Sequence, residues 1–426
     1  MQKLEQLNDA IYKNIHIDTI LSMLNEIDIN YINYIFNNKK TLLINSIIHL
    51  PFESANKFID NILKFKNINV DHQDNLGKTA LMHCIKIGFN EVFNKLIDYG
   101  CNLNLQDKDG ETALYTAIDK LYFVYQHDVN KFQEFAYKLI EQKSCNVDIQ
   151  TNILKKTALL NCVDCINSYN RHNYDDSKGE RQNYKYNKRF NEIAFKLIDN
   201  GCDVNIRDSS DRTALTNACW GSYGLSDIAS KLIDTPSSDL NLSDDNGNAL
   251  EGAIWCRPKI ALKIMKTGRC DLSVLCDSST LLIISIERKR IECCKYLILN
   301  NSCDINLQNR HGKTALILSI DKDLDEITEL LLEKKCDVTQ TLFDRLALKS
   351  ACNKNNIKIV NRIIDRYIEN HDISFLDISL DITKYFYYSN VIDKIWKMYQ
   401  NEIIGIINKR DLGDINVIVL ISQYVC

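Results

Sequence analysis

Two short segments carry residues that could hold a nucleotide phosphate: "DNLGKTAL" at 74–81 and "NRHGKTAL" at 309–316. Gly-Lys-Thr ends the phosphate-binding loop G-x-x-x-x-G-K-[ST], whose backbone N–H groups and lysine surround the phosphates. That loop needs a second glycine five residues earlier, where this chain has His72 and Leu307. The in-phase segments "DKDGETAL" and "SSDRTAL" also lack the Gly-Lys pair. The sequence therefore predicts a turn at both places, with no nucleotide and no other cofactor.

The 16 cysteines and 8 histidines are the remaining candidates for metal or redox chemistry. Zinc sites usually combine two ligand pairs at short spacing, but Cys162-x-x-Cys165 has no second pair and only His172 close by. No catalytic pattern such as G-x-S-x-G or H-E-x-x-H is present. We therefore predict no catalytic and no metal-binding residues. The cysteines are expected to fill small buried positions, and many recur at one place in a repeat: Cys101, Cys145, Cys202, Cys270, Cys303 and Cys336.

One pattern recurs along most of the chain, beginning at the threonine of Gly-Lys-Thr. Its clearest copies read T-A-L-x-x-small, and it starts at Thr41, Thr79, Thr112, Thr157, Thr213, Asn248, Thr280, Thr314 and Leu346. Successive starts are 38, 33, 45, 56, 35, 32, 34 and 32 residues apart. A second block, "LIDYGCNLNLQD" at 96–107 and "LIDNGCDVNIRD" at 197–208, follows in phase. Such a period is typical of a repeat protein, whose units bury their apolar faces against their neighbours.

Each unit is predicted to contain two helices and a turn. The threonine caps the first helix by accepting backbone N–H groups, and Ala, Leu and the small sixth residue form one face at helical spacing. The second helix ends at a left-handed glycine in two copies, Gly100 and Gly201. The next segment alternates like a strand and turns at Asp-x-x-Gly. The predicted fold class is an all-α repeat, an α-solenoid of helix–turn–helix units with β-hairpin fingers.

This pattern resembles the ankyrin repeat family, D-x-x-G-x-T-P-L-H-x-A followed by a second helix and L-L-x-x-G-A-D-V-N, over residues 38–372. Ala replaces the family's Pro in most copies. In the family, the His ties neighbouring units together, so its loss predicts fewer hydrogen bonds between repeats. The residues in its place are Met82, Tyr115, Leu160, Thr216, Glu251 and Ile317. With its Asn-, Ile- and Lys-rich composition, the chain resembles the ankyrin proteins of giant DNA viruses of the mimivirus type.

The spacing predicts three regions along the chain. About nine repeats occupy 38–372, a capping helix pair occupies 1–37, and capping helices with a tail occupy 373–426. Terminal units are expected to be atypical because their outer face meets water. The spacings of 45 and 56 residues place insertions between the two helices of adjacent repeats, near 119–131 and 165–190. We expect the first insertion to extend helices, and the polar, Tyr-rich second one to be mobile.

Bulk properties argue against several classes of function. A net charge of −4 in 426 residues does not favour nucleic-acid binding, and no apolar run reaches the roughly 18 residues that would span a bilayer. The first residues do not resemble a signal peptide, and cysteines in a long chain of this kind are expected to stay reduced. We therefore expect a monomer in the cytoplasm, with the nucleus as an alternative, and neither a membrane nor a nucleic-acid partner.

The resemblance implies a non-enzymatic scaffold of viral origin that binds a host or viral protein of unknown identity through a concave face and the hairpin tips. Lys78→Ala is expected to weaken such a partner and to leave the fold unchanged. Two alternatives remain open: an adaptor for a host ubiquitin ligase through 376–426, and nucleic-acid binding through the basic, Tyr-rich segment 165–189. The family's variable positions and the nearby aromatics map to Asn75, Leu76, Lys78, Lys86, Lys108, Asp109, Glu111, Tyr115, Ser209, Ser210, Arg212, Trp220, Tyr223, Trp255, Arg310, His311 and Lys313.

Overall fold

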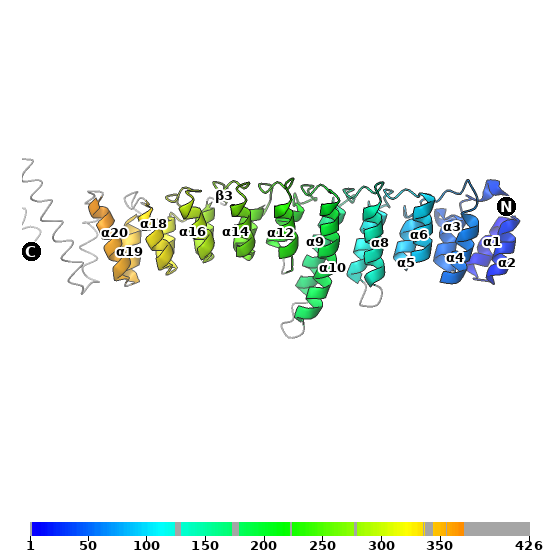
Figure 1. The fold of residues 1–426 in the computed structure, drawn as a ribbon, viewed down its shortest axis with the longest axis horizontal. Helices are drawn as coiled ribbons and strands as arrows, with labels where there is room; N and C mark the ends of the chain where they lie inside the picture. The colour runs from blue at the N-terminus through cyan, green and yellow to red at the C-terminus, as the bar shows by residue number, and fades with distance from the viewer. Residues whose placement is uncertain are drawn as a thin grey trace, which may run out of the picture. The chain divides into compact units, whose positions relative to one another are not determined.

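A computed structural model describes residues 2–123, 129–172, 179–221, 224–276, 279–334, 336, 344–354 and 356–369. The chain divides into two compact units, Met1–Cys270 and Asp271–Cys426. Nearly every regular element of the described residues is a helix (Figure 1), which confirms the predicted all-α repeat class. Repeats are numbered below by their capping residue, from repeat 1 at Thr41 to repeat 9 at Leu346.

The first unit opens with a helix pair that precedes repeat 1, and then holds repeats 1–6. Short 3₁₀ turns lie at Ile29–Tyr31 and Asn37–Lys39, and one small sheet joins β1 (Ser243–Asp244) to β2 (Gly247–Asn248). The helices are α1 (Gln2–Tyr12), α2 (Ile17–Asn25), α3 (Leu42–His49), α4 (Phe52–Ile62), α5 (Ala80–Ile87), α6 (Asn90–Tyr99), α7 (Ala113–Phe123), α8 (Val129–Glu141), α9 (Ala158–His172), α10 (Gly179–Asp199), α11 (Ala214–Trp220), α12 (Ser226–Asp234), α13 (Ala249–Cys256) and α14 (Pro258–Lys266).

The second unit holds repeats 7–9. Its small sheet joins β3 (Leu275–Cys276) to β4 (Ser279–Thr280). Its helices are α15 (Leu281–Glu287), α16 (Ile291–Leu299), α17 (Ala315–Asp321), α18 (Asp325–Glu333), α19 (Asp344–Asn353) and α20 (Ile357–Glu369). The segment 373–426, for which capping helices and a tail were expected, lies outside the described residues.

Each repeat contributes one helix to each of two layers. In the first unit the first helices pack in chain order (α1, α3, α5, α7, α9, α11, α13), and second helices such as α8, α10, α12 and α14 do the same. In the second unit α15, α17 and α19 form one layer, and α16, α18 and α20 form the other. Large apolar side chains are buried where these helices meet, and the rings of Phe93 and Phe135 lie 4.5 Å apart.

The capping threonines begin the first helices, as predicted. In repeat 2 the Thr79 Oγ1 accepts the Met82 N–H at 3.3 Å, and in repeat 4 the Thr157 Oγ1 accepts the Leu160 N–H at 3.3 Å. The same bond recurs at Thr41, Thr112, Thr213, Thr280 and Thr314, and Asn248 makes it with its side-chain oxygen. The small sixth residue is fully buried in every repeat: Ser46, Cys84, Ala117, Cys162, Ala218, Ala253, Ser285, Ser319 and Ala351.

The fingers contain less strand than the alternating sequence predicts. Among the described residues only the two sheets of two-residue strands and a bridge between Gln308 and Thr314 pair as β-structure. The other fingers are successions of turns, because side chains take up backbone N–H groups that a strand would otherwise pair. Gly100 and Gly201 have φ of 87° and 80°, so both adopt the left-handed conformation that was predicted for a helix end.

The two insertions lengthen helices. Helix α5 has 8 residues, whereas α7 has 11 and α8 has 13. The second insertion was expected to be mobile, but 165–172 lies in α9 and 179–190 lies in α10, while 173–178 is outside the described residues. Helices α9 and α10 therefore extend beyond their neighbours on the side away from the fingers (Figure 1).

Candidate interaction surface

In repeats 2, 3, 5 and 8 one side chain organises the finger tip. In repeat 3 the Asp107 Oδ1 accepts the N–H groups of Asp109 and Glu111 at 3.0 and 2.9 Å. The equivalent side chains of repeats 2, 5 and 8 make the same pair of bonds, and they are Asp74, Asp208 and Asn309. Since each tip satisfies its own backbone donors, the tip side chains are held in place and remain available to another molecule.

Backbone hydrogen bonds join successive finger tips in the first unit. The N–H of Lys108 donates to the Leu76 carbonyl, and that of Asn152 donates to the Asp109 carbonyl, each at 3.0 Å. Looser bonding between repeats was expected from the loss of the family's His; bonds do join these repeats, and the comparison with the family stays a prediction. Three glutamines each donate both to their own finger and to a carbonyl of the next repeat: Gln73, Gln106 and Gln150.

Several finger tips present large apolar or charged side chains to solvent. Ile153 is 77% exposed, Leu76 is 52% exposed and Leu154 is 48% exposed. The tip of repeat 4 is one residue longer than that of repeat 3, and Lys155 there has a positive φ of 52°. The tip residues that the sequence nominated are exposed too: Asn75, Leu76, Lys108, Asp109, Ser209, Ser210, Arg310 and His311.

A row of paired positions lies beneath the tips. It consists of the residue before each capping residue and the residue seven positions after it, and we call it the inner row. From repeat 2 to repeat 8 the pairs are Lys78 and Lys86, Glu111 and Asp119, Lys156 and Asp164, Arg212 and Trp220, Gly247 and Trp255, Ser279 and Glu287, and Lys313 and Asp321.

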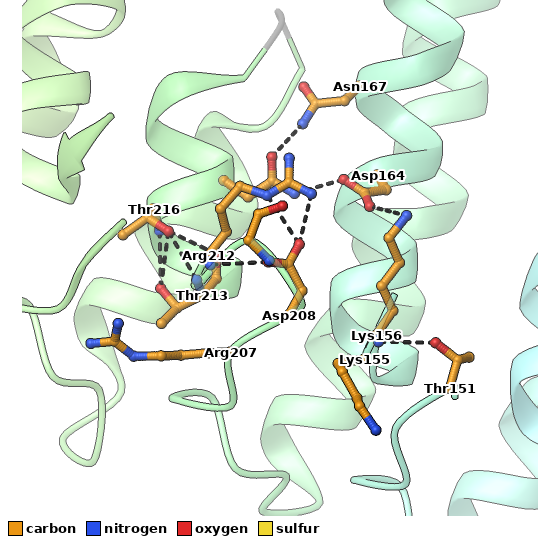
Figure 2. A network of polar contacts seen from close by, with 12 residues as sticks. Thr151, Lys155, Lys156, Asp164, Asn167, Arg207, Asp208, Arg212, Thr213 and Thr216 are labelled. Atoms are coloured by element: carbon orange, nitrogen blue, oxygen red, sulfur yellow. Dashed lines mark hydrogen bonds and ion pairs between the residues drawn. The ribbon is translucent and has the colours of Figure 1, made fainter. Parts of the chain in front are cut away.

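In repeats 4 and 8 the inner-row pair is an ion pair. The Lys156 ammonium lies 2.6 Å from the Asp164 carboxylate, and Lys313 lies 2.7 Å from Asp321. Figure 2 shows Lys156 reaching from the finger of repeat 4 to Asp164 on α9. The other oxygen of Asp164 accepts the Asn217 amide at 2.6 Å. Both oxygens of this carboxylate are therefore occupied within the protein.

Lys78 is held differently from what the sequence suggested. Its ammonium lies 2.8 Å from Asp107 Oδ2 in the next repeat, and the two side chains are 18% and 0% exposed. The hydrogen bond to Asp107 and the attraction of that carboxylate raise the pKa of Lys78 despite its partial burial. We therefore now expect Lys78→Ala to destabilise the fold, because the change would leave a buried carboxylate without its cation.

Repeat 3 has a carboxylate at both inner-row positions. Burial and the nearby Asp107 and Asp119 carboxylates raise the pKa of Glu111 from 4.5 to about 7. Burial likewise raises the pKa of Asp119 and that of Tyr115, which stands beside both acids. Within the part of the chain that the structure describes, neither carboxylate takes part in an ion pair.

Comparison with known proteins identifies the repeat. A family model described as ankyrin repeats matches residues 48–126, 258–342 and 281–377. The chain is an ankyrin repeat protein. An ankyrin repeat protein of Acanthamoeba polyphaga mimivirus is 38% identical over 53 residues, which are 12% of this chain and 13% of that protein. The chain thus spans about an eighth of the length of this viral relative.

Two tryptophans occupy the inner row of ankyrin repeats 5 and 6. The rings of Trp220 and Trp255 lie 6.3 Å apart, and Trp255 is 38% exposed. Gly252 makes room for the Trp220 ring, because a Cβ at Gly252 would lie 2.8 Å from it. The third aromatic nominated for this region, Tyr223, lies outside the described residues.

The inner row of ankyrin repeats 7 and 8 borders a hollow of mixed charge. Its volume is about 780 Å³, and it is lined by Glu287, Arg288, Asn309, His311, Lys313, Leu318, Asp321 and Lys322. Asp321 also accepts a hydrogen bond from Ser350, and the Lys313 and Ser350 bonds lower its pKa against the opposing effect of burial. Two residues nominated from the sequence, His311 and Lys313, therefore line the same hollow. Lys86, another nominated residue, lies on the first helix of repeat 2 and is exposed.

The residues that could have done chemistry have structural roles. Gly77 adopts a left-handed φ of 77° and Thr79 caps α5, so Gly-Lys-Thr forms a finger and a helix start. Burial raises the pKa of Cys101 to about 12 and that of Cys165 well above its usual value, which keeps these thiols protonated. Among the described residues no group of three or more His, Cys, Asp or Glu is placed to hold a metal ion.

In the insertion considered above for nucleic-acid binding, Tyr169 and Tyr186 contact other aromatic rings of the protein. Tyr169 and Tyr186 stack on each other with ring centres 3.7 Å apart, and Tyr186 also contacts Phe190. Lys188 lies 3.9 Å from Glu192 one turn along α10. These rings and this charge are therefore engaged within the protein, whereas base stacking needs an open aromatic face.

Sequence reasoning missed the acidic half of this surface. Asp119 and Asp164 were not nominated, although aligning the repeats on their capping residue puts both at the same position. Ile153 and Leu154 were missed as well, and the extra residue in "TNILKKT" was the available signal, since an apolar pair in a lengthened turn is unusual.

Proposed function

We propose that this ankyrin repeat protein is a non-enzymatic scaffold that binds a protein partner through its finger tips and inner row. The observation that carries the proposal is the row of exposed side chains on hydrogen-bonded tips. Leu76, Ile153 and Leu154 are exposed although the backbone that carries them is fixed by bonds to the neighbouring tips. A preorganised apolar surface gains affinity because little conformational freedom is lost on binding.

The same proposal places the protein in a virus-infected cell. The supporting observation is the matched stretch in the mimivirus ankyrin repeat protein. The partner would be a host or a viral protein in the cytoplasm, with the nucleus as the alternative compartment. No helix among the described residues has the length and apolar character to cross a membrane. We further propose that the protein acts as a monomer.

Two other functions have less support. Nucleic-acid binding through 165–189 is disfavoured by the stacked pair of Tyr169 and Tyr186. An adaptor role for a host ubiquitin ligase would depend on 376–426, which lies outside the described residues. The scaffold function therefore rests on the first unit, where the fingers are fixed best.

Affinity purification from infected host cells tests the scaffold function. The full chain would be compared with the triple variant Leu76→Ser, Ile153→Ser, Leu154→Ser, and with Leu299→Ser as a control of similar exposure at the end of α16. We expect a specific protein to be retained by the wild type and the control and lost with the triple variant. Retention of the same proteins by all three chains would contradict the proposal.

A further inference from the structure

The inner row of repeat 3 has two acids where equivalent positions carry an acid and a lysine. Repeats 4 and 8 place Lys156 against Asp164 and Lys313 against Asp321. Repeat 3 places Glu111 at the lysine position, close enough for Asp119 to raise its pKa. Repeats 4 and 8 therefore serve as an internal comparison for repeat 3, because their inner-row acid has a lysine beside it and the inner-row acid of repeat 3 does not.

Two of the lysines around this pair are already bound to other carboxylates. Lys78 is bound to Asp107 at 2.8 Å and Lys156 to Asp164 at 2.6 Å. Lys120 follows Asp119 on α7 and lowers its pKa, but no ion pair joins the two among the described residues. The two carboxylates therefore face solvent with a deficit of positive charge.

An exposed apolar tip adjoins the finger that carries Glu111. The tip of repeat 4 is hydrogen-bonded to that of repeat 3: the Asn152 N–H donates to the Asp109 carbonyl at 3.0 Å. Asp109 lies two residues before Glu111. On the side of repeat 5, the Ser209 N–H donates a hydrogen bond to the Leu154 carbonyl, also at 3.0 Å. Ile153, 77% exposed, lies between these two fixed points. Fixed apolar side chains of this kind gain free energy when a partner covers them and lose little conformational freedom in doing so.

We propose that this surface binds a segment of a partner protein that carries a lysine or arginine a few residues from a large apolar side chain. The cation would be held by Glu111 and Asp119, and the apolar side chain would pack on Ile153 and Leu154. This inference rests on the proposed scaffold function and specifies its partner. Charge complementarity favours such a peptide over a nucleic acid, whose phosphates the two carboxylates would repel.

A displayed library of random peptides tests the specificity. After selection on the immobilised full chain, the enriched peptides are expected to share a basic residue near a large apolar one. An enriched peptide would then be titrated calorimetrically into the wild type and two double variants. We expect Glu111→Gln with Asp119→Asn to weaken binding by about tenfold, and Ile153→Ser with Leu154→Ser to weaken it by a similar factor.

Matched controls separate this site from the rest of the array. Glu53→Gln changes an exposed acid on α4, and Leu299→Ser changes an exposed apolar residue at the end of α16; both lie outside the tips and the inner row and should leave the peptide affinity unchanged. Circular dichroism of each variant verifies folding, and the single change Asp119→Asn provides a second test if the double variant unfolds.

Four results would overturn the inference. Enriched peptides without a basic residue would do so, as would affinities unchanged by both double variants. If the peptides instead lost affinity with Trp255→Ala, the scaffold function would stand and this site would be wrong. If neither a peptide nor a cellular protein bound the chain, both proposals would fail together.

Discussion

Repeats 3 and 4 are adjacent copies of one unit, but their inner-row positions differ: repeat 4 has a lysine and an acid there, and repeat 3 has two acids. In repeat 4 the Asp164 carboxylate is occupied by Lys156 and by Asn217, at 2.6 Å each. In repeat 3 the Glu111 and Asp119 carboxylates have no such partners among the described residues. The caps are nevertheless alike, with the Thr112 bond at 3.2 Å and the Thr157 bond at 3.3 Å.

This difference shows which side chains the repeat requires in order to fold and which it can vary. Because the first helix starts in the same way with an ion pair or with two acids, the inner-row charge is not required to form the repeat. The organising side chain is required, since Asp107 holds the tip of repeat 3 through two backbone N–H groups. Functional variation can therefore accumulate in the inner row while the tip and cap positions stay fixed.

The largest expected effect comes from removing the Asp107 side chain, which fixes the finger tip of repeat 3. Asp107→Ala would leave two N–H groups without their acceptor and Lys78 without its partner. We expect a loss of about 3 kcal/mol in the free energy of unfolding, measured by urea titration. Asp109→Ala, at the exposed tip, is the control and should change it by less than about 0.5 kcal/mol. Equal effects of the two changes would show that the tip is not organised in this way.

The second prediction concerns the contact between the two fingers. Gly110 has a φ of 81°, and a Cβ there would lie 2.4 Å from the Asn152 nitrogen of repeat 4. Gly201 has a similar φ of 80° with nothing within 4 Å. Both changes to Ala strain the backbone, so Gly201→Ala should cost about 1 kcal/mol and Gly110→Ala about 2 kcal/mol or more in unfolding free energy. Equal losses would mean that the fingers do not press on each other there.

Much of the repeat could be predicted from the sequence because it depends on local chemistry. A threonine cap, a small sixth residue and a left-handed glycine act within a few positions of the chain, as Thr79, Cys84 and Gly100 illustrate. The predicted strands failed for a local reason too, because one Asp side chain such as Asp107 takes the N–H groups of a finger.

The candidate surface was less predictable because its contacts join different repeats. Lys78 and Asp107 are 29 residues apart, so their pairing appears only when the stacking of two units is known. The second insertion looked like a polar loop, but Tyr169 and Tyr186 stack once α9 and α10 lie side by side. Sequence spacing alone could not bring these two tyrosines together.

The third prediction removes the ion pair of repeat 4 to make it resemble repeat 3. Lys156→Ala leaves Asp164 with the Asn217 amide as its described partner. Because both charged side chains are 17% exposed, we expect a loss of about 1 kcal/mol in unfolding free energy, smaller than for a fully buried pair. A chemical denaturation curve measures it. A loss as large as that of Asp107→Ala would refute the view that the inner row tolerates either arrangement.

The smallest expected effect is that of Glu111 titration, because this carboxylate is partly exposed and solvent screens its interaction with the nearby acids. Its pKa is about 7 in the folded protein and 4.5 for the free side chain. Between pH 4.5 and pH 7 the folded state therefore holds a proton on Glu111 that the unfolded chain has lost. Stability from this group is therefore lost as the pH rises from about 4.5 to 7. Glu111→Gln should raise the melting temperature relative to the wild type at pH 8 and leave it unchanged near pH 4.

Comparing the variant with the wild type at each pH cancels the titration of other groups. This matters because several charged and titratable groups act on Glu111 or stand beside it. They lie in the finger of repeat 2, in the finger of repeat 3 itself and on α7, and they are Lys78, Asp107, Asp109, Tyr115 and Asp119. A variant no more stable than the wild type at pH 8 would mean that repeat 3 carries no unbalanced charge. The contrast with repeat 4 would then disappear, and with it the reason for a cationic partner at this position.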